Sequence, residues 1–420
     1  MVPVVERVLG PHSRSGSGGW RFLGPLGTRG ITVTAFILFL LAPVLGCEAP
    51  SPPEGTDAPE YTAVGQATVI WDGELLRAPF DILPLGSDAL LILDADALFA
   101  IPRGGGDPRR IGGRGEGPGE FVSVTGGGVT PDGGLVIVDA RLRRATFLDP
   151  AGGYLHSHSL GAPPELNVAT QGPILPLPDG HLGLRWEFGL VDTDGPRAPM
   201  GLARHDDSGT PELLAEWEGL EWTDTPWAPM PSGPAGHSPP FAISAARSVV
   251  YWLNDDTRCI ERLLPATGER LAPVCPPFPS VPIEPYVPSE AEVEEAGVSG
   301  LLADVLLGKH GFQDFSGDHP PIQRLLADDQ GCLWMRIVKD DAPYDPMIQN
   351  LLPATRPSEY EWWVVDPEDG EIAARLLVPE RFRPRLVLAD TIFGLMEQPD
   401  HTLAPATKPF DRKGWEHCRP

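Results

Sequence analysis

Short apolar runs separated by polar turns recur along the chain, and their spacing favours strands over helices. In the clearest example an Asp-Gly turn at 132–133 leads into "LVIV", which ends at Asp139. An earlier run, "LLIL", ends at Asp94 in the same way. Runs that are apolar at successive positions and bounded by turn residues are typical of strands buried on both faces. The pattern therefore predicts an all-β protein.

These runs form six copies of one unit, a turn followed by paired strands. The first turns of the copies lie near positions 88, 132, 179, 247, 330 and 390, so the first two intervals are 44 and 47 residues. A four-stranded propeller blade takes about 40 to 50 residues, and the longer intervals leave room for insertions. The repeat predicts a six-bladed β-propeller over residues 64–410, with a sandwich or a solenoid as alternatives.

One insertion has the pattern of a short helix, near residues 288–310. Ser289 and Glu292 have the spacing of a capping box, and acidic residues fill the first turn, where the helix dipole favours negative charge. We expect this helical insertion to pack on the propeller, either as a connector or as a lid over its channel.

A second insertion, residues 215–241, carries three tryptophans among prolines: Trp217, Trp222 and Trp227. Aromatic rings on a rigid loop form a stacking platform for sugars or peptides. The alternative is that these rings fill the core.

The N-terminal region predicts export. Arg29 precedes an apolar run at 31–45, which is too short to span a bilayer comfortably, and Gly46-Cys47 follows it. The ending "VLGC" resembles a bacterial lipobox, which implies a signal peptide over 1–46 and lipidation of Cys47. A non-lipidated signal or an anchor helix is the alternative. Residues 47–63, rich in Pro, Ser and acids, predict a flexible tether to the membrane.

Composition agrees with an exported, folded body. The chain has 50 prolines and 48 glycines for turns, and 41% of its 420 residues are hydrophobic, including 11 tryptophans, which is enough for a core. The formal net charge of −26 argues against nucleic acid and against docking on anionic lipid. We expect a lipid-anchored protein of the bacterial cell envelope, with its domain in the periplasm or outside the cell.

An exported protein can form disulfides, and for one pair of cysteines the predicted hairpin geometry supports a disulfide. Cys259 and Cys275 each lie eight residues from Thr267, so a hairpin that turns at 265–268 places them opposite each other. The alternative is two separately buried thiols. Cys332 and Cys418 have no comparable argument, and their pairing stays open.

The segment "RIGGRGEGPGEF" with the blade after it resembles the repeat of six-bladed propellers of the NHL/TolB-like kind, and especially a group of uncharacterised bacterial lipoproteins. The resemblance covers roughly residues 65–395. It implies a fold and a location in the cell, not a reaction. The last blade departs from the pattern, so the way in which the ring closes stays open, and residues 411–420 are expected to form a C-terminal tail.

The same segment is also a candidate binding element. Its glycines allow a tight crossing between two blades, which needs no ligand. Under the functional interpretation Arg114, Glu116 and Glu120 line the mouth of the channel, where backbone amides also suit an anion.

No catalytic motif is present, so we expect a ligand- or protein-binding module rather than an enzyme, with no cofactor. The alternative is a calcium-dependent hydrolase or lyase of the lactonase type, with Asp94 and Asp139 as channel ligands. Against it, aspartates that end strands usually hold turns. His156 and His158 are expected on one face of a strand. They are either two of the ligands of a metal site or residues of an exposed strand edge without a functional role.

Overall fold

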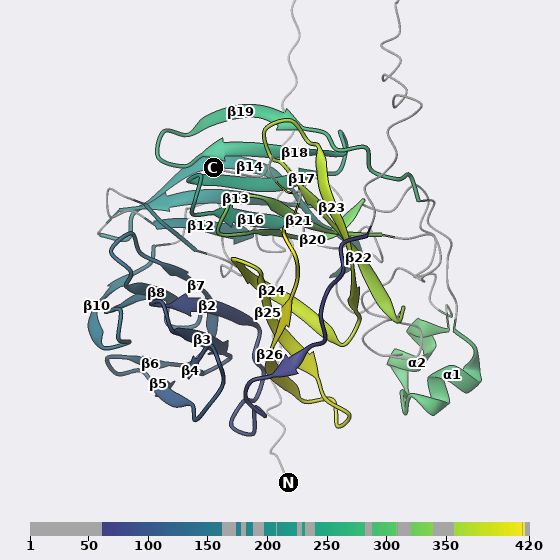
Figure 1. The fold of residues 1–420 in the computed structure, drawn as a ribbon, viewed down its shortest axis with the longest axis horizontal. Coiled ribbons are helices and arrows are strands. Elements are labelled where there is room, and N and C mark those ends of the chain that lie inside the picture. The colour runs from purple at the N-terminus through teal and green to yellow at the C-terminus, as the bar shows by residue number, and fades with distance from the viewer. Residues whose placement is uncertain are drawn as a thin grey trace, which may run out of the picture. The chain divides into compact units, whose positions relative to one another are not determined.

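Six antiparallel sheets follow one another along the chain and form a six-bladed β-propeller (Figure 1). The computed structural model describes residues 61–161, 174–177, 182–187, 197–206, 208–224, 229–231, 240–281, 288–307, 309, 321–338, 357–413 and 415. All of them belong to one unit, residues 54–420.

The first three blades are built from strands in chain order, the first strand of each being the innermost. Blade 1 has β2 (Asp81–Leu85), β3 (Ala89–Asp94), β4 (Ala97–Pro102), β5 (Arg109–Arg114) and the short β6 (Glu120–Phe121), which runs parallel to β5. Blade 2 has β7 (Val124–Val129), β8 (Leu135–Asp139), β9 (Arg144–Leu148) and β10 (Tyr154–Ser159). Blade 3 has β11 (Leu175–Pro176), β12 (Leu182–Glu187), β13 (Arg197–His205), β14 (Pro211–Asp224) and β15 (Pro229–Pro231).

The other three blades follow the same plan. Blade 4 has β16 (Phe241–Ser244), β17 (Val249–Asn254), β18 (Cys259–Leu264) and β19 (Glu269–Val274). Blade 5 has β20 (Ile322–Ala327), β21 (Leu333–Ile337), β22 (Glu359–Val365) and β23 (Ile372–Pro379). Blade 6 has β24 (Phe382–Leu388), β25 (Thr391–Glu397), β26 (Leu403–Pro409) and, as its outer strand, β1 (Thr68–Val69).

The ring closes because the start of the chain completes the last blade. In β1, Thr68 lies opposite Thr407 and Val69 opposite Ala406 of β26. The innermost strands of the first and last blades, β2 and β24, are in contact. Pairing with β1 covers the edge of β26, which would otherwise present unpaired backbone groups. Ring closure was left open by the sequence, and the structure assigns it to these two strands.

The core lies between blades, and the two-residue period of each strand divides its side chains between two neighbours. In β3, Leu90 and Ile92 pack in a cluster with blade 6, whereas Leu91 and Leu93 pack in a cluster with blade 2. Six such clusters of buried residues each join a neighbouring pair of blades around the ring. This explains why the second strands are continuously apolar.

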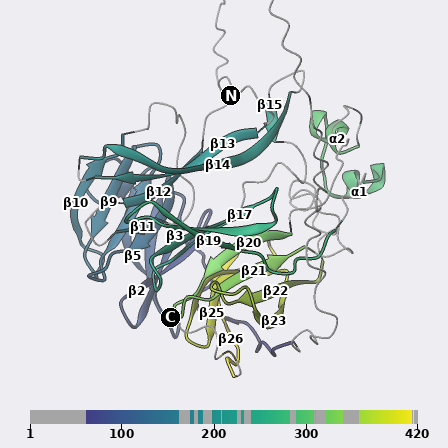
Figure 2. The same ribbon diagram turned by 90° about the horizontal axis from the view of Figure 1, so that it is seen from above.

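The helical insertion consists of two short helices, α1 (Glu290–Glu295) and α2 (Leu301–Leu306). The expected capping box is present at the start of α1, between Ser289 and Glu292. Gly297 and Gly300 both have positive φ, which separates the two helices. In both views the helices lie at the margin of the sheets rather than over the inner strands (Figures 1 and 2), which favours the connector over the lid.

Both predicted ends of the propeller are longer than expected. At the N-terminal end, the hydroxyl of Tyr61 donates to Glu361 at 3.0 Å, so ordered contacts begin within the segment assigned to the tether. At the C-terminal end, Arg412 pairs with Asp328 at 3.0 Å, and Trp415 is buried against Phe410. Within the described residues no helix is both long and apolar enough to cross a membrane. Residues 1–46 and Cys47 lie outside them.

Candidate functional site

Three of the innermost strands contain a β-bulge, and in each the extra residue is polar. The pairing of β7 with β8 skips Thr125, that of β20 with β21 skips Gln323, and that of β24 with β25 skips Arg385. A bulge re-aims one side chain away from the regular alternation, and bulges are common next to binding and catalytic sites. The bulges therefore mark the inner strands as the place to look for a site.

The same three side chains have buried polar atoms without a protein partner. Among the described residues, Thr125 Oγ1, Gln323 Oε1 and both Nε and Nη1 of Arg385 accept or donate no hydrogen bond. Buried polar groups are normally paired, so each exception needs an explanation. Other unpartnered atoms occur singly within the blades, for example Thr146 Oγ1 and the hydroxyl of Tyr251. In β7, β20 and β24, by contrast, the unpartnered atom belongs to the bulged residue itself.

Asp81 adds a carboxyl group next to this set. It begins β2, which contacts both β7 and β24, and β24 in turn contacts β20. The four residues thus lie on four consecutive innermost strands, in the order β7, β2, β24, β20. We call Asp81, Thr125, Gln323 and Arg385 the inner-strand site.

The two charged members of the inner-strand site lie deep in the protein, although each residue as a whole is half-buried rather than fully buried. Burial raises the pKa of Asp81 to about 6, although the Arg385 charge and the amide of Ile82 oppose the shift. Burial lowers the pKa of Arg385, opposed by the charge of Asp81. Deep groups with perturbed pKa values that remain accessible are typical of functional sites.

A neighbouring arginine, unlike Arg385, is neutralised by an ion pair. Arg383, two residues before Arg385 on β24, donates to Glu397 Oε2 at 2.6 Å, and Glu397 also contacts His401 Nδ1 at 3.0 Å. Arg383 is therefore engaged in a local ion pair at the end of β25. Arg385 has no such ion pair with any described carboxylate, and its Nε and Nη1 are without a hydrogen-bond partner among the described residues.

Asp94 and Asp139, the candidate metal ligands, have the same structural role in two blades. Each is fully buried at the end of a second strand. Asp94 accepts hydrogen bonds from the amides of Arg77, Ala78 and Ala95 at 3.0, 2.6 and 2.9 Å. Asp139 accepts from Val122, Ser123 and Leu142 at 2.6, 3.0 and 2.9 Å. Both carboxylates hold the chain that enters the innermost strand of their own blade, as a turn-forming aspartate does.

Among the residues that the structure describes, no group of three or more His, Cys, Asp or Glu side chains is placed to hold a metal ion. His156 and His158 lie on β10, the outer strand of blade 2, where His156 stacks on Phe147 with 4.5 Å between ring centroids. The histidine pair therefore lies on an exposed edge, without a third ligand.

The glycine-rich crossing is a compact turn at the outer edge of blade 1. It adds β6 outside β5, at the opposite side of the sheet from β2. The carboxylate of Glu120 accepts from the Gly117 amide at 2.9 Å, and Arg144 donates to the Glu116 carbonyl at 3.0 Å. Arg114 lies 3.8 Å from Asp96. The functional interpretation placed Arg114, Glu116 and Glu120 at the channel mouth; they lie at the outer edge of blade 1 instead, because the crossing pairs with β5, and the segment acts as the structural crossing that the sequence also predicted.

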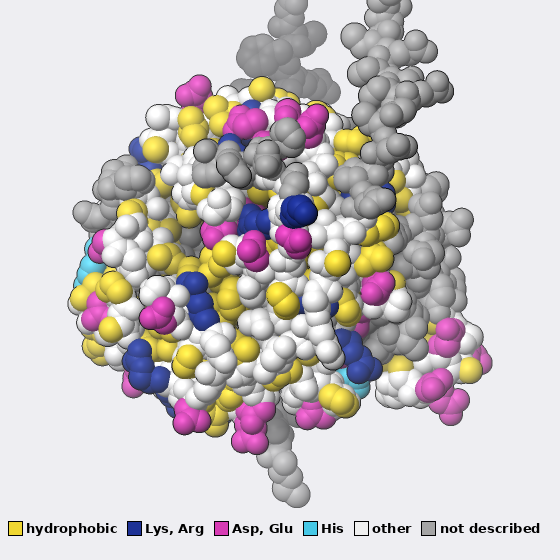
Figure 3. Space-filling view, viewed as in Figure 1, with side chains coloured by type: hydrophobic (Ala, Val, Ile, Leu, Met, Phe, Trp, Pro, Cys, Tyr) yellow, Lys and Arg dark blue, Asp and Glu magenta, His cyan; other side chains and the backbone are white. Residues whose placement is uncertain are grey.

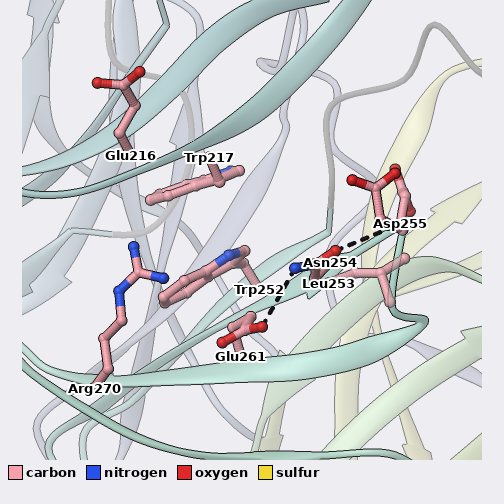
Figure 4. Close-up of a pocket in the computed structure, with 9 residues that line it drawn as sticks. Glu216, Trp217, Trp252, Leu253, Asn254, Asp255, Glu261 and Arg270 are labelled. Carbon is pink, nitrogen blue, oxygen red and sulfur yellow. Dashed lines mark hydrogen bonds between the residues drawn. The ribbon is translucent and has the colours of Figure 1, made fainter. Parts of the chain in front are cut away.

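Trp217 lies in the interface between blades 3 and 4. The Trp217 indole packs on Phe241 and Trp252, a cross-strand pair of blade 4, with ring centroids 6.0 and 5.0 Å away, and Arg270 lies over Trp252 at 5.7 Å. Figure 4 shows the two indoles beside a cavity of about 220 Å³ whose rim carries Glu216 and Arg270. Trp217 is partly buried and packs on the core cluster between blades 3 and 4, as the core-filling alternative predicts, and its indole also lines the cavity. The side chain of Trp222 and all of Trp227 lie outside the described residues.

The cysteines of blade 4 are paired. Cys259 and Cys275 form a disulfide with their Cα atoms 4.3 Å apart, across the hairpin of β18 and β19. Cys332 is buried and is not part of a disulfide, and Cys418 lies outside the described residues.

No family model matches this sequence, and no curated protein matches it at a significant level. Solved structures do match. A member of the DUF4221 family from Bacteroides vulgatus aligns with a TM-score of 0.52 at 12% identity, covering 84% of this chain and 99% of that one. A protein from Bacteroides fragilis described as exported has a TM-score of 0.47 at 13% identity over 85% and 98% of the two chains. A gluconolactonase from Xanthomonas campestris has a TM-score of 0.43 at 12% identity over 86% and 99%. At these identities the likeness shows the propeller fold.

Sequence reasoning missed all four members of the inner-strand site. A weak indication is visible in retrospect, since "DILPL" and "FRPRLVL" place charged residues in strands that line the centre of the ring. The bulges cannot be recognised from either strand alone, because a bulge is a mismatch between two strands.

Proposed function

We propose that this protein is an exported, lipid-anchored β-propeller that binds a small polar ligand at the inner-strand site. The observation that carries the proposal is the coincidence of three bulges with three polar side chains whose buried atoms have no protein partner among the described residues. Leaving such atoms unpaired costs free energy, about 1–3 kcal/mol for each group. A ligand that completes these hydrogen bonds would recover that free energy.

Export is supported by the N-terminal pattern, with its apolar run and "VLGC" ending. The disulfide between Cys259 and Cys275 suits an oxidising compartment. A structural neighbour described as exported has the same fold, which is consistent with this location. We place the domain in the cell envelope, held through a lipid on Cys47.

The lactonase-type alternative is not favoured. The carboxylates it assigned to calcium, Asp94 and Asp139, already accept three backbone hydrogen bonds each. Moving either carboxylate onto a metal would release the amides that hold the entry to an innermost strand.

The proposal is tested by ligand capture. The mature protein is incubated with a small-molecule extract, washed by gel filtration and examined by native mass spectrometry. We expect a bound small molecule that is lost in Arg385→Gln and Gln323→Leu and retained in Arg141→Gln, which changes an exposed arginine of blade 2. A molecule retained equally in all of these proteins would place the site elsewhere, and no retained molecule would argue against the binding function.

A further inference from the structure

The inner-strand site has one permanent charge. Arg385 stays protonated across the physiological range, because an arginine pKa is far above neutrality even when burial lowers it. Its Nε and Nη1 have no partner in the described part of the chain, and no described carboxylate lies within ion-pair distance of it. A buried cation without a direct counter-ion is costly and is stabilised strongly by an anion placed against it.

The other charged groups around Asp81 are already engaged. On β3, Asp94 accepts three backbone hydrogen bonds. On β24, Arg383 is paired with Glu397 of β25. The facing strand β7, Val124–Val129, carries no ionisable side chain. Among the described residues, Arg385 is the ionisable side chain whose charge acts on Asp81. The local charge is therefore set by two groups: it is +1 when Asp81 is protonated and zero when it is ionised.

The two neutral members select for hydroxyl groups. Gln323 Oε1 is an acceptor and requires a donor, which a carboxylate cannot supply. The hydroxyl of Thr125 both donates and accepts. A ligand that satisfies Arg385 and Gln323 together carries an anionic group and a hydrogen-bond donor, and a neutral hydroxyl suits this place better than an ammonium, which the Arg385 charge would repel.

We propose that the inner-strand site binds a small hydroxylated carboxylic acid, with the carboxylate at Arg385, a ligand hydroxyl at Gln323, and a proton taken up by Asp81. This inference rests on the proposed ligand-binding function and names its ligand class. The proton is required because an ionised Asp81 would repel the incoming carboxylate. A ligand carboxylate close to Asp81 raises the pKa of Asp81 above its value of about 6 in the free protein, so the complex holds more protons than its components.

Four-carbon probes separate the possibilities: malate, succinate, erythritol and putrescine. Malate differs from succinate by a hydroxyl, erythritol is neutral, and putrescine is cationic. Binding is measured by isothermal titration calorimetry between about pH 6.5 and pH 8.5, where both acids are fully ionised, in buffers of different ionisation enthalpy. We expect malate to bind more tightly than succinate, with affinity that falls as pH rises by up to about tenfold per pH unit. We also expect net proton uptake, and no binding of erythritol or putrescine.

Two variants assign the effects to residues. Asp81→Asn should bind malate without dependence on pH and without proton uptake, since the amide is uncharged throughout. Arg385→Gln should lose binding, whereas Arg141→Gln should match the wild type. Because Asp81→Asn is expected to keep binding, a folding defect cannot be mistaken for support.

Several results would overturn the inference. One is binding of putrescine or erythritol in place of the acids, which would leave the proposed ligand-binding function intact. Another is acid binding whose affinity is constant or rises with pH. Failure of both acids to bind would also overturn it, while ligand capture from an extract would still decide the proposed function separately.

Discussion

Asp81 should make the protein less stable at neutral pH than at acidic pH, and Asp81→Asn should remove this effect. Its pKa rises from 3.8 in the unfolded chain to about 6 in the folded protein, because burial disfavours the charged form. The folded state therefore binds more protons than the unfolded state between these values. The stabilisation is present below the unfolded pKa and is lost as pH rises through the folded pKa. A shift of about two pKa units corresponds to about 3 kcal/mol.

The measurement is the difference in free energy of unfolding between Asp81→Asn and the wild type, from urea denaturation followed by tryptophan fluorescence. The difference should be near zero at about pH 3, where Asp81 is largely protonated in both the folded and the unfolded state, and should rise toward about 3 kcal/mol in favour of the variant above about pH 7. The comparison cancels the pH dependence of all other groups.

Asp132→Asn is the matched control. Its carboxylate lies on the surface, and the hydroxyl of Thr130 donates to it at 2.5 Å and lowers its pKa. Stability from this group is present above the unfolded pKa and is lost as pH falls, so the control variant should differ in the opposite direction. If Asp81→Asn were less stable than the wild type at about pH 7.5, Arg385 would outweigh burial, and the reasoning about this site would be refuted.

The remaining predictions concern the bulges, the turn aspartates, ring closure and the anchor. Thr125→Val should raise the free energy of unfolding by about 1 kcal/mol and weaken ligand binding, as measured by urea denaturation and calorimetry. Thr146→Val removes a similar unpartnered hydroxyl in β9 and should stabilise the protein without changing ligand binding. Destabilisation by Thr125→Val would show that its hydroxyl has a hydrogen-bond partner. Asp139→Ala leaves three amides without an acceptor and should lower the free energy of unfolding by about 3 kcal/mol in the same urea denaturation. A loss below about 1 kcal/mol would contradict the turn-holding role of Asp139. Deletion of residues 61–70 uncovers the edge of β26 and should cause association, visible by light scattering; a stable monomer would contradict closure by β1. Cys47→Ala should abolish incorporation of radiolabelled lipid, and continued labelling would move the modification elsewhere.

Much of the fold could be predicted because the information is local. The continuous apolar runs "LLIL" and "LVIV" identify strands that are buried on both faces, and their recurrence identifies blades. The pairing of Cys259 with Cys275 depends on one hairpin, and the capping box of Ser289 and Glu292 spans one helical turn. Each feature joins residues that are close in sequence.

The candidate site could not be predicted in the same way. For Asp94 and Asp139 the sequence favoured a turn-forming role and left a calcium-binding role as the alternative, and their amide contacts show that they hold turns. The functional interpretation placed Arg114, Glu116 and Glu120 at the channel mouth, but the parallel pairing of β5 with β6 keeps them at the outer edge. These outcomes depend on which strand a segment pairs with.

The sequence by itself determined that this chain forms six blades of paired strands, because its short apolar runs, each bounded by turn residues, recur six times along the chain. The tertiary structure decided what the ring encloses. Asp81 and Arg385 come from opposite ends of the chain and interact only because β2 and β24 meet at ring closure. Three polar residues leave the regular alternation of side chains: Thr125, Gln323 and Arg385. They do so because β7, β20 and β24 each have one residue more than the segment of the neighbouring strand with which they pair. Burial, pairing register and charge proximity are properties of strands in contact, and no single strand contains them.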